Sequence, residues 1–178
     1  MTGISFKNHI QSRLDALVGL QLSIVRDALD MKMFHFGDIY LSPSGKGSVG
    51  TYALHVQCPW RIVSEGMILT GSFDRYEPPQ ENRELDEENN RSGTLQRARL
   101  FHILEGYDEA ARSIVNSTNN FAVLSIKVDE FGGLDLSLSG GYNLQLFPSG
   151  ASSEDWRFFK TGGAPHLVVE AGRAEEVE

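Results

Sequence analysis

Six polar side chains between residues 52 and 76 are of types that can do acid–base or anion-binding chemistry. Read with the two-residue period of a strand, they fall on one face of two successive apolar runs: His55, Gln57, Arg61, Thr70, Ser72 and Asp74. A histidine, a carboxylate and a guanidinium within reach of each other could transfer protons or clamp an anion. The alternatives are a solvated face, or a structural pair of Arg61 and Asp74 across the strands. The face is therefore a candidate site without an assigned catalytic role.

Other side chains with metal-binding or nucleophilic chemistry lack partners at useful spacing. His102 and Glu105 stand three residues apart in a predicted helix, but the first helix offers no second pair of this kind. Cys58 is the single cysteine and falls on an apolar strand face, which predicts a small buried side chain. The glycine-rich segment 44–48 lacks the spacing of a phosphate-binding loop and leads into a strand. We therefore predict no metal, no cofactor and, more weakly, no enzyme.

A predicted antiparallel hairpin over residues 52–76 brings the six polar groups together. Its strands are 51–63 and 67–76, and Gly66 supplies the positive φ that a tight reversal at Glu65-Gly66 needs. The register that keeps the apolar faces together sets Ile62 opposite Leu69. Pro59 cannot donate to a ladder, so it marks an edge or a bulge.

The rest of the chain alternates helical and strand patterns. Apolar spacing predicts helices that begin near Phe6 and at Thr94, the second running to Ile114. Further strands are predicted at 20–24, 29–36, 121–128, 134–138, 142–146, 156–160 and 166–169, with a loop at 42–50. This pattern predicts an α+β fold: a largely antiparallel, twisted sheet of about eight strands with two packed helices. A closed or half-closed barrel is the main variant, and an internal duplication is the less favoured reading.

One globular domain is predicted over 1–170, followed by a disordered acidic tail at 171–178. The segment 77–93 within the domain is rich in glutamate and aspartate and holds one large apolar side chain, Leu85. Such a segment cannot bury enough apolar area to offset its conformational entropy. We expect a mobile loop there, and a lid over a site is the alternative.

The net charge of −8 restricts the classes of partner. The chain has no basic footprint for phosphates, so neither a nucleic acid nor an anionic membrane is expected, whereas a basic protein partner is electrostatically favoured. A single cysteine fits a reducing compartment, and no segment has the pattern of a signal peptide or a membrane span. We expect a cytoplasmic protein.

The block Tyr52–Arg61 resembles a family of small bacterial proteins of unassigned function. The segments 34–37, 71–74 and 165–169 belong to the same pattern, so the resemblance covers most of the chain. It implies a bacterial, cytoplasmic setting and carries no activity.

Three hypotheses follow for function. The first is a non-enzymatic, protein-binding module of the immunity or accessory type that engages a basic partner. The second is a small-ligand binder or enzyme that uses the polar face of segment 52–76. The third is a structural subunit with a large apolar self-contact.

Overall fold

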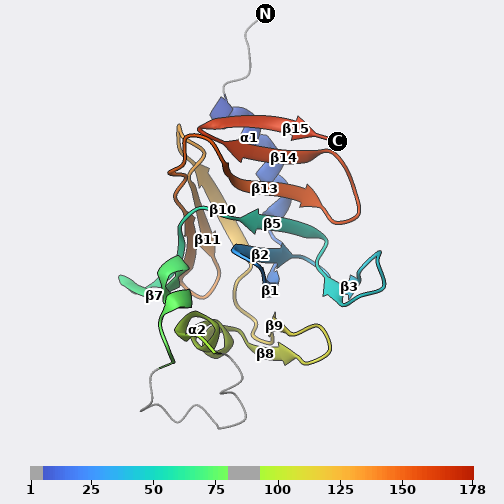
Figure 1. Ribbon diagram of the computed structural model, residues 1–178, viewed down its shortest axis with the longest axis vertical. Coiled ribbons are helices and arrows are strands. Elements are labelled where there is room, and N and C mark those ends of the chain that lie inside the picture. The colour runs from blue at the N-terminus through green and yellow to red at the C-terminus, as the bar shows by residue number, and fades with distance from the viewer. Residues whose placement is uncertain (1–5, 80–92) are drawn as a thin grey trace, which may run out of the picture.

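The computed structural model describes residues 6–79 and 93–178, which form two large antiparallel sheets, a two-stranded ribbon and two α-helices (Figure 1). Every strand pair in this part of the chain is antiparallel. The predicted α+β class, with a largely antiparallel sheet system and two packed helices, is confirmed.

The larger sheet has eight strands in the order β15-β14-β13-β5-β2-β1-β9-β8. In that order they span Arg173–Val177, His166–Glu170, Glu154–Lys160, Tyr52–Val56, Met31–Phe36, Leu22–Ala28, Ser113–Asn116 and Glu105–Asp108. Strand β14 alternates buried and more exposed residues, whereas β1 and β2 in the middle of the sheet are buried along most of their length.

The smaller sheet has five strands in the order β10-β11-β12-β6-β7. They span Val123–Val128, Leu134–Leu138, Tyr142–Leu146, Trp60–Ser64 and Met67–Gly71. The first three are consecutive in the chain, so the predicted three-stranded meander is confirmed. A two-stranded ribbon of β3 (Tyr40–Leu41) and β4 (Ser48–Val49) encloses most of the segment that was predicted as a loop.

The hydrophobic core fills the space between the two sheets. Phe34 on β2 and Trp60 on β6 meet across this space at 5.1 Å between ring centroids, with their planes 84° apart. This is the edge-to-face geometry that aromatic pairs prefer. Trp156 on β13 is fully buried, and its Nε1–H donates to the carbonyl oxygen of Gly132 at 2.8 Å. The core therefore joins strands of both sheets.

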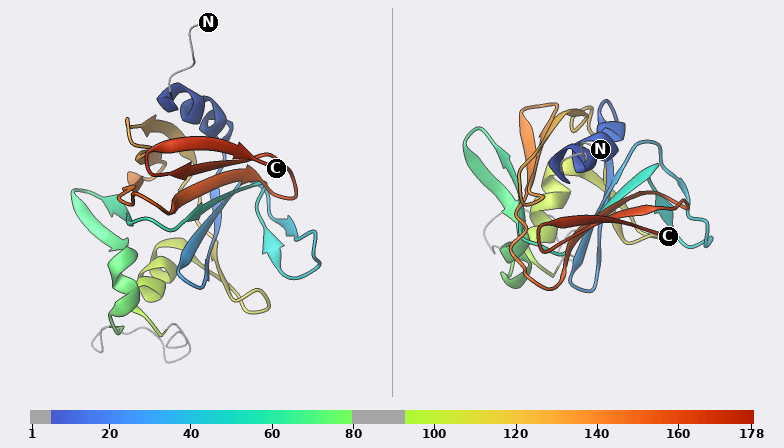
Figure 2. Two further views of the ribbon diagram at one scale, coloured as in Figure 1. Left: turned by 45° about the horizontal axis from the view of Figure 1, so that its top comes forward. Right: turned by 90° about the horizontal axis from the view of Figure 1, so that it is seen from above.

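The two helices lie at opposite ends of this space (Figures 1 and 2). Helix α1 (Phe6–Leu14) continues into the 3-10 turn η1 (Asp15–Leu17) and buries Ile10 and Leu14. Helix α2 (Leu95–Leu104) begins at Thr94, whose Oγ1 accepts a hydrogen bond from the backbone N–H of Arg97 at 3.2 Å. Both predicted helix starts agree with the structure.

The prediction that the second helix continues to Ile114 is wrong. Helix α2 ends at Leu104 because Glu105 takes a left-handed φ of 65°, and the hairpin of β8 and β9 follows. Gly106 pairs closely with Val115, and a Cβ at position 106 would lie 2.5 Å from the Val115 carbonyl oxygen. Of the apolar residues that suggested a longer helix, Tyr107 and Ile114 lie on these two strands instead.

The prediction of one continuous strand over 51–63 is also wrong. The chain leaves the larger sheet after Val56 and enters the smaller sheet at Trp60. Within the connection, the N–H groups of Gln57 and Cys58 both donate to the Asp155 carbonyl oxygen, at 2.8 and 3.0 Å. Pro59 marks this crossing, which fits its lack of a backbone donor.

The predicted reversal at Glu65-Gly66 is confirmed, with φ of 51° and 74°. Two positive φ values are typical of a type I′ turn, which matches the twist of the flanking strands. Beyond it a bulge shifts the register, so Ile62 pairs with Thr70 rather than with Leu69 as predicted. After Gly71 the chain forms the 3-10 helix η2 (Ser72–Tyr76), where a strand was predicted.

The prediction of a disordered tail over 171–178 differs from the structure, in which β15 pairs with β14 along its whole length. The carboxylate of Glu176 lies 3.1 Å from Arg13 Nε and 3.2 Å from His9 Nε2, so β15 also contacts α1. Most of the segment 77–93, for which mobility or a lid was predicted, lies outside the described residues.

Candidate functional site

The six polar residues singled out in the sequence do not share one face, because β5, β6 and η2 lie in different parts of the fold. His55 belongs to the larger sheet and Arg61 to the smaller one, whereas Ser72 and Asp74 lie on η2. The structure therefore separates the imidazole, the guanidinium and the carboxylate that the predicted hairpin brings together.

His55 lies in a row of rings across four neighbouring strands of the larger sheet. Its ring centroid is 6.3 Å from that of His35 and 4.8 Å from that of Phe159, and Phe159 stacks on His166 at 4.0 Å. Burial, followed by the charges of Arg157 and Arg26, lowers the pKa of His55 to about 4. A neutral, ring-packed histidine of this kind serves packing rather than proton transfer near neutral pH.

Arg61 and Asp74 have separate partners. The Nε–H of Arg61 donates to Gln145 Oε1 at 2.7 Å, and its guanidinium lies 4.8 Å from the Phe147 ring. Asp74 accepts hydrogen bonds from Thr70 Oγ1 at 2.9 Å and from the N–H of Gly71 at 3.2 Å. The alternative of an Arg61–Asp74 cross-strand pair is therefore wrong as well.

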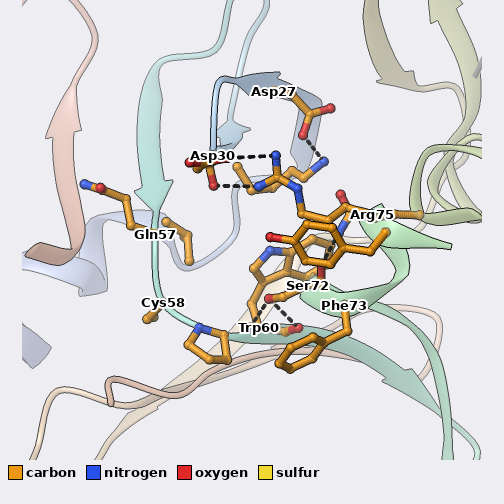
Figure 3. Close-up of a pocket in the computed structure, with 13 residues that line it drawn as sticks. Asp27, Asp30, Gln57, Cys58, Trp60, Ser72, Phe73 and Arg75 are labelled. Carbon is orange, nitrogen blue, oxygen red and sulfur yellow. Dashed lines mark hydrogen bonds and ion pairs between the residues drawn. The ribbon is translucent and has the colours of Figure 1, made fainter. Parts of the chain in front are cut away.

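Gln57 and Ser72 are the two predicted residues that line a pocket between the sheets and η2 (Figure 3). The pocket has a volume of about 260 Å³. Thirteen residues line it: Asp27, Asp30, Lys32, Val56, Gln57, Cys58, Pro59, Trp60, Ser72, Phe73, Arg75, Tyr76 and Gln96. We call it the Lys32 pocket.

Five parts of the fold position the walls of the Lys32 pocket. The ends of β1 and β2 supply the residues between 27 and 32, and the crossing between the sheets supplies those from 56 to 60. The 3-10 helix η2 is held against β6 because Ser72 Oγ accepts from the N–H of Trp60 at 2.7 Å. Gln96 on α2 donates to the Gly71 carbonyl oxygen at 2.7 Å, which ties α2 to the start of η2.

Two ion pairs occur in this pocket, and in each the cation is the more buried partner. Lys32 pairs with Asp27, and their side chains are 5% and 44% exposed. Arg75 pairs with Asp30 at 3.1 Å, and their side chains are 30% and 96% exposed. Burial lowers the pKa of Lys32, and the Asp27 carboxylate opposes this shift. The inside of the pocket is thus more positive than its rim.

Large apolar side chains surround the mouth of the pocket. Phe73 and Tyr76 on η2 are 75% and 73% exposed. Leu29, beside Asp30, is 95% exposed, and its carbonyl oxygen accepts from Arg75 Nη2 at 3.1 Å. Trp60 is 5% exposed, and its ring centroid lies 5.8 Å from the Lys32 ammonium. Exposed apolar side chains and two carboxylates thus lie at the mouth, and Lys32 and Trp60 lie deeper.

Cys58 also lines the pocket, and its buried position agrees with the sequence prediction. Burial, with a contribution from the Asp155 charge, raises the pKa of the Cys58 thiol to about 12, so the thiol is protonated and a poor nucleophile at neutral pH. Among the described residues, no cluster of three or more histidine, cysteine, aspartate or glutamate side chains could hold a metal ion.

The sequence prediction missed Lys32, although the chain contains a signal for it. Lys32 lies on the same strand face as Phe34 and Phe36, both of which are fully buried. A lysine in line with two core residues indicates a buried charge that needs a partner. Asp27, its partner, pairs with it across the β1–β2 hairpin. The sequence predicted strands at 20–24 and 29–36 but not this pairing.

Comparison with known proteins gives no family model, no curated protein and no solved structure that matches this chain. The resemblance of the Tyr52–Arg61 block to a family of small bacterial proteins therefore stays a prediction. Within the described residues, neither helix has the length and apolar character needed to cross a membrane.

Proposed function

We propose that this protein is a non-enzymatic, protein-binding module that contacts its partner through the mouth of the Lys32 pocket. The observation that carries the proposal is the exposure of Phe73 and Tyr76, which line the pocket, and of Leu29, whose carbonyl oxygen is bonded to Arg75. Contiguous exposed apolar groups with a polar surround are typical of protein interaction sites.

The residue types at the mouth are those that contribute most to binding energy in protein interfaces. Aromatic residues and arginine are enriched there, and pockets that admit an anchor side chain lie at the centre of the contact. Phe73, Tyr76 and Arg75 follow one another along η2, and Arg75 lies 5.4 Å from the Tyr76 ring. Because Arg75 is bonded to the β1–β2 turn, this surface is held in place before a partner binds.

A basic partner fits the charge of the chain. The net charge of −8 attracts cationic proteins over long distances, and Asp27 and Asp30 present acidic groups at the rim. This supports a role of the immunity or accessory type, in which an acidic protein covers part of a basic one.

The alternative of an enzyme or small-ligand binder that uses His55, Arg61 and Asp74 has less support. These residues lie on separate elements, and each has its own structural contacts. The charged groups of the Lys32 pocket are paired with one another, so none of them is an unpaired acid or base.

The proposal is tested by affinity capture from extract of the native source, with captured proteins identified by mass spectrometry. The double variant Phe73→Ser/Tyr76→Ser removes the apolar mouth. The control double variant Leu124→Ser/Phe131→Ser removes two side chains that are 60% and 69% exposed on and next to β10, the far edge of the smaller sheet.

The expected result is a protein that the wild type and the control retain and that the mouth variant loses. Raising the ionic strength should weaken its capture if the partner is basic. A wild type that retains nothing beyond what the mouth variant retains contradicts the proposal.

A further inference from the structure

An apolar contact between this protein and a partner does not explain why the pocket contains Lys32. Its side chain is 5% exposed, yet it lines the pocket next to Trp60. Taking an ammonium out of water is costly, and a structural role would be met more cheaply by an apolar residue beside Phe34. A buried lysine whose pKa is lowered by desolvation, in a pocket, is a binding-site candidate on physical grounds.

The donors of the two pocket cations are used differently. Arg75 directs Nη1 to the Asp30 carbonyl oxygen and Nη2 to the Leu29 carbonyl oxygen and the Asp30 carboxylate. Lys32 has one ion-pair partner in the described chain, Asp27, and faces the Trp60 ring. An ammonium carries three N–H donors, so Lys32 has capacity for a further acceptor on its pocket side.

The charge distribution selects the kind of acceptor. Each carboxylate is more exposed than the cation it pairs with, so positive charge lies deeper in the pocket than negative charge. A carboxylate on the pocket floor, inside the two rim carboxylates, would have the Lys32 ammonium as its donor. An ammonium at the same place would be repelled by the Lys32 charge.

The other residues that line the pocket determine which kind of chemical group can carry the carboxylate of a ligand. Trp60, Pro59 and Phe73 offer apolar surface. The volume of about 260 Å³ lies below the range of roughly 300–1,000 Å³ that is usual for drug-sized ligands. The pocket therefore suits one small apolar or aromatic group.

We propose that the Lys32 pocket binds a carboxylate attached to a small apolar body, with Lys32 as the donor to the carboxylate and Trp60 against the body. The carboxylate belongs either to the protein partner, as an acidic side chain or a chain terminus, or to a free organic acid. This proposal adds a ligand class to the proposed function, and it rests on the proposed function for the location of the partner contact.

The test uses three probes of one shape: 3-phenylpropionate, its neutral amide 3-phenylpropanamide, and the cation 3-phenylpropylamine. Binding is followed by NMR in low salt, with the indole N–H of Trp60 as reporter. One charge-assisted hydrogen bond predicts that the carboxylate binds about tenfold more tightly than the amide. The amine should bind more weakly than the amide.

Variants link this difference to Lys32. In Lys32→Met, the carboxylate and the amide should bind with the same affinity. The control Lys127→Met removes an equal charge from an exposed position on β10 and should keep the tenfold difference in affinity. Equal binding of carboxylate and amide to the wild type overturns the proposal, as does an unchanged difference in Lys32→Met. Absence of carboxylate binding at millimolar concentration overturns it too.

A competition arm identifies the source of the carboxylate. If 3-phenylpropionate displaces the protein captured by the wild type, the partner supplies the carboxylate; if the captured protein stays bound while the probe binds, a free acid is the natural occupant. The two proposals fail separately, because the capture experiment depends on Phe73 and Tyr76 and the probe experiment depends on Lys32.

Discussion

Replacing His35 by asparagine should make the protein markedly less sensitive to acid. His35 lies on β2 and is 2% exposed, and its Nδ1 accepts a hydrogen bond from the N–H of Gly50 at 3.3 Å. Burial, followed by the charges of Arg26 and His55, lowers its pKa from 6.5 to about 3. Asparagine can accept the same hydrogen bond through Oδ1 and does not titrate.

The sign of the effect follows from proton binding in the two states. Between pH 6.5 and pH 3 the unfolded chain binds a proton at this residue and the folded chain does not, so stability falls as the pH falls through that window. At pH 5, about 1.5 pH units below the unfolded pKa, the loss from His35 is about 2 kcal/mol relative to pH 8, at roughly 1.4 kcal/mol per unit. His35→Asn should remove this part of the acid sensitivity.

Urea unfolding of wild type and variant at pH 5, 6, 7 and 8, followed by tryptophan fluorescence, measures the difference. The two curves of unfolding free energy against pH should converge by about 2 kcal/mol towards pH 5, whatever the offset at pH 8. His102→Asn, at an exposed position on α2, is the control for loss of an imidazole. Parallel loss of stability in wild type and His35→Asn would refute the assignment of a buried, neutral His35.

Three further predictions concern packing, the buried ion pair and the thiol. Gly106→Ala should lower the free energy of unfolding by about 1–3 kcal/mol, because its Cβ would meet the Val115 carbonyl oxygen. The control Gly163→Ala should change this free energy by less than about 0.5 kcal/mol in the same assay, because its Cβ would make only ordinary van der Waals contacts. Asp27→Asn should lower the free energy of unfolding by about 3 kcal/mol, because it leaves the ammonium of Lys32 buried and unpaired. Lys32→Met should lower it by less than about 1 kcal/mol, because water can hydrate the Asp27 carboxylate. Equal losses of stability in thermal unfolding would contradict this account. Cys58 should react with a thiol reagent at pH 8 about 1,000-fold more slowly than a cysteine of pKa 9, and a rate near that of the unfolded chain would show that the thiol is accessible.

Local signals in the sequence predicted those parts of the fold that depend on neighbouring residues. The meander from β10 to β12 has glycine at its turns and clear alternation, and both are local properties. The turn at Glu65-Gly66 followed from one glycine between two apolar runs. The start of α2 at Thr94 was predicted from apolar spacing, and the Thr94 side chain caps the helix.

Features that depend on distant residues were beyond the sequence pattern. The run 51–63 reads as one strand, yet the Asp155 carbonyl oxygen binds the N–H groups of Gln57 and Cys58 where the chain changes sheet. Position 106 follows a helical pattern, but its close approach to Val115 is visible only once β8 and β9 pair. Tertiary pairing outweighed local propensity at both places.

The candidate site was predicted only in part for the same reason. An alternation of polar residues assigned His55, Arg61 and Asp74 to one face, and the change of sheet separated them. Lys32, the most buried cation of the pocket, lies within the predicted strand 29–36 but was not singled out. Its shared face with Phe34 was the observation that could have identified it.

The contact between β15 and α1 has a consequence for biosynthesis. The ribosome makes residues 6–14 well before residues 173–177, yet Glu176 is a partner of both His9 and Arg13. Until β15 emerges, β14 is the edge strand of the larger sheet, and α1 lacks the carboxylate that pairs with Arg13. The contact between α1 and this edge of the sheet therefore forms late in synthesis, after the strands between them have been made.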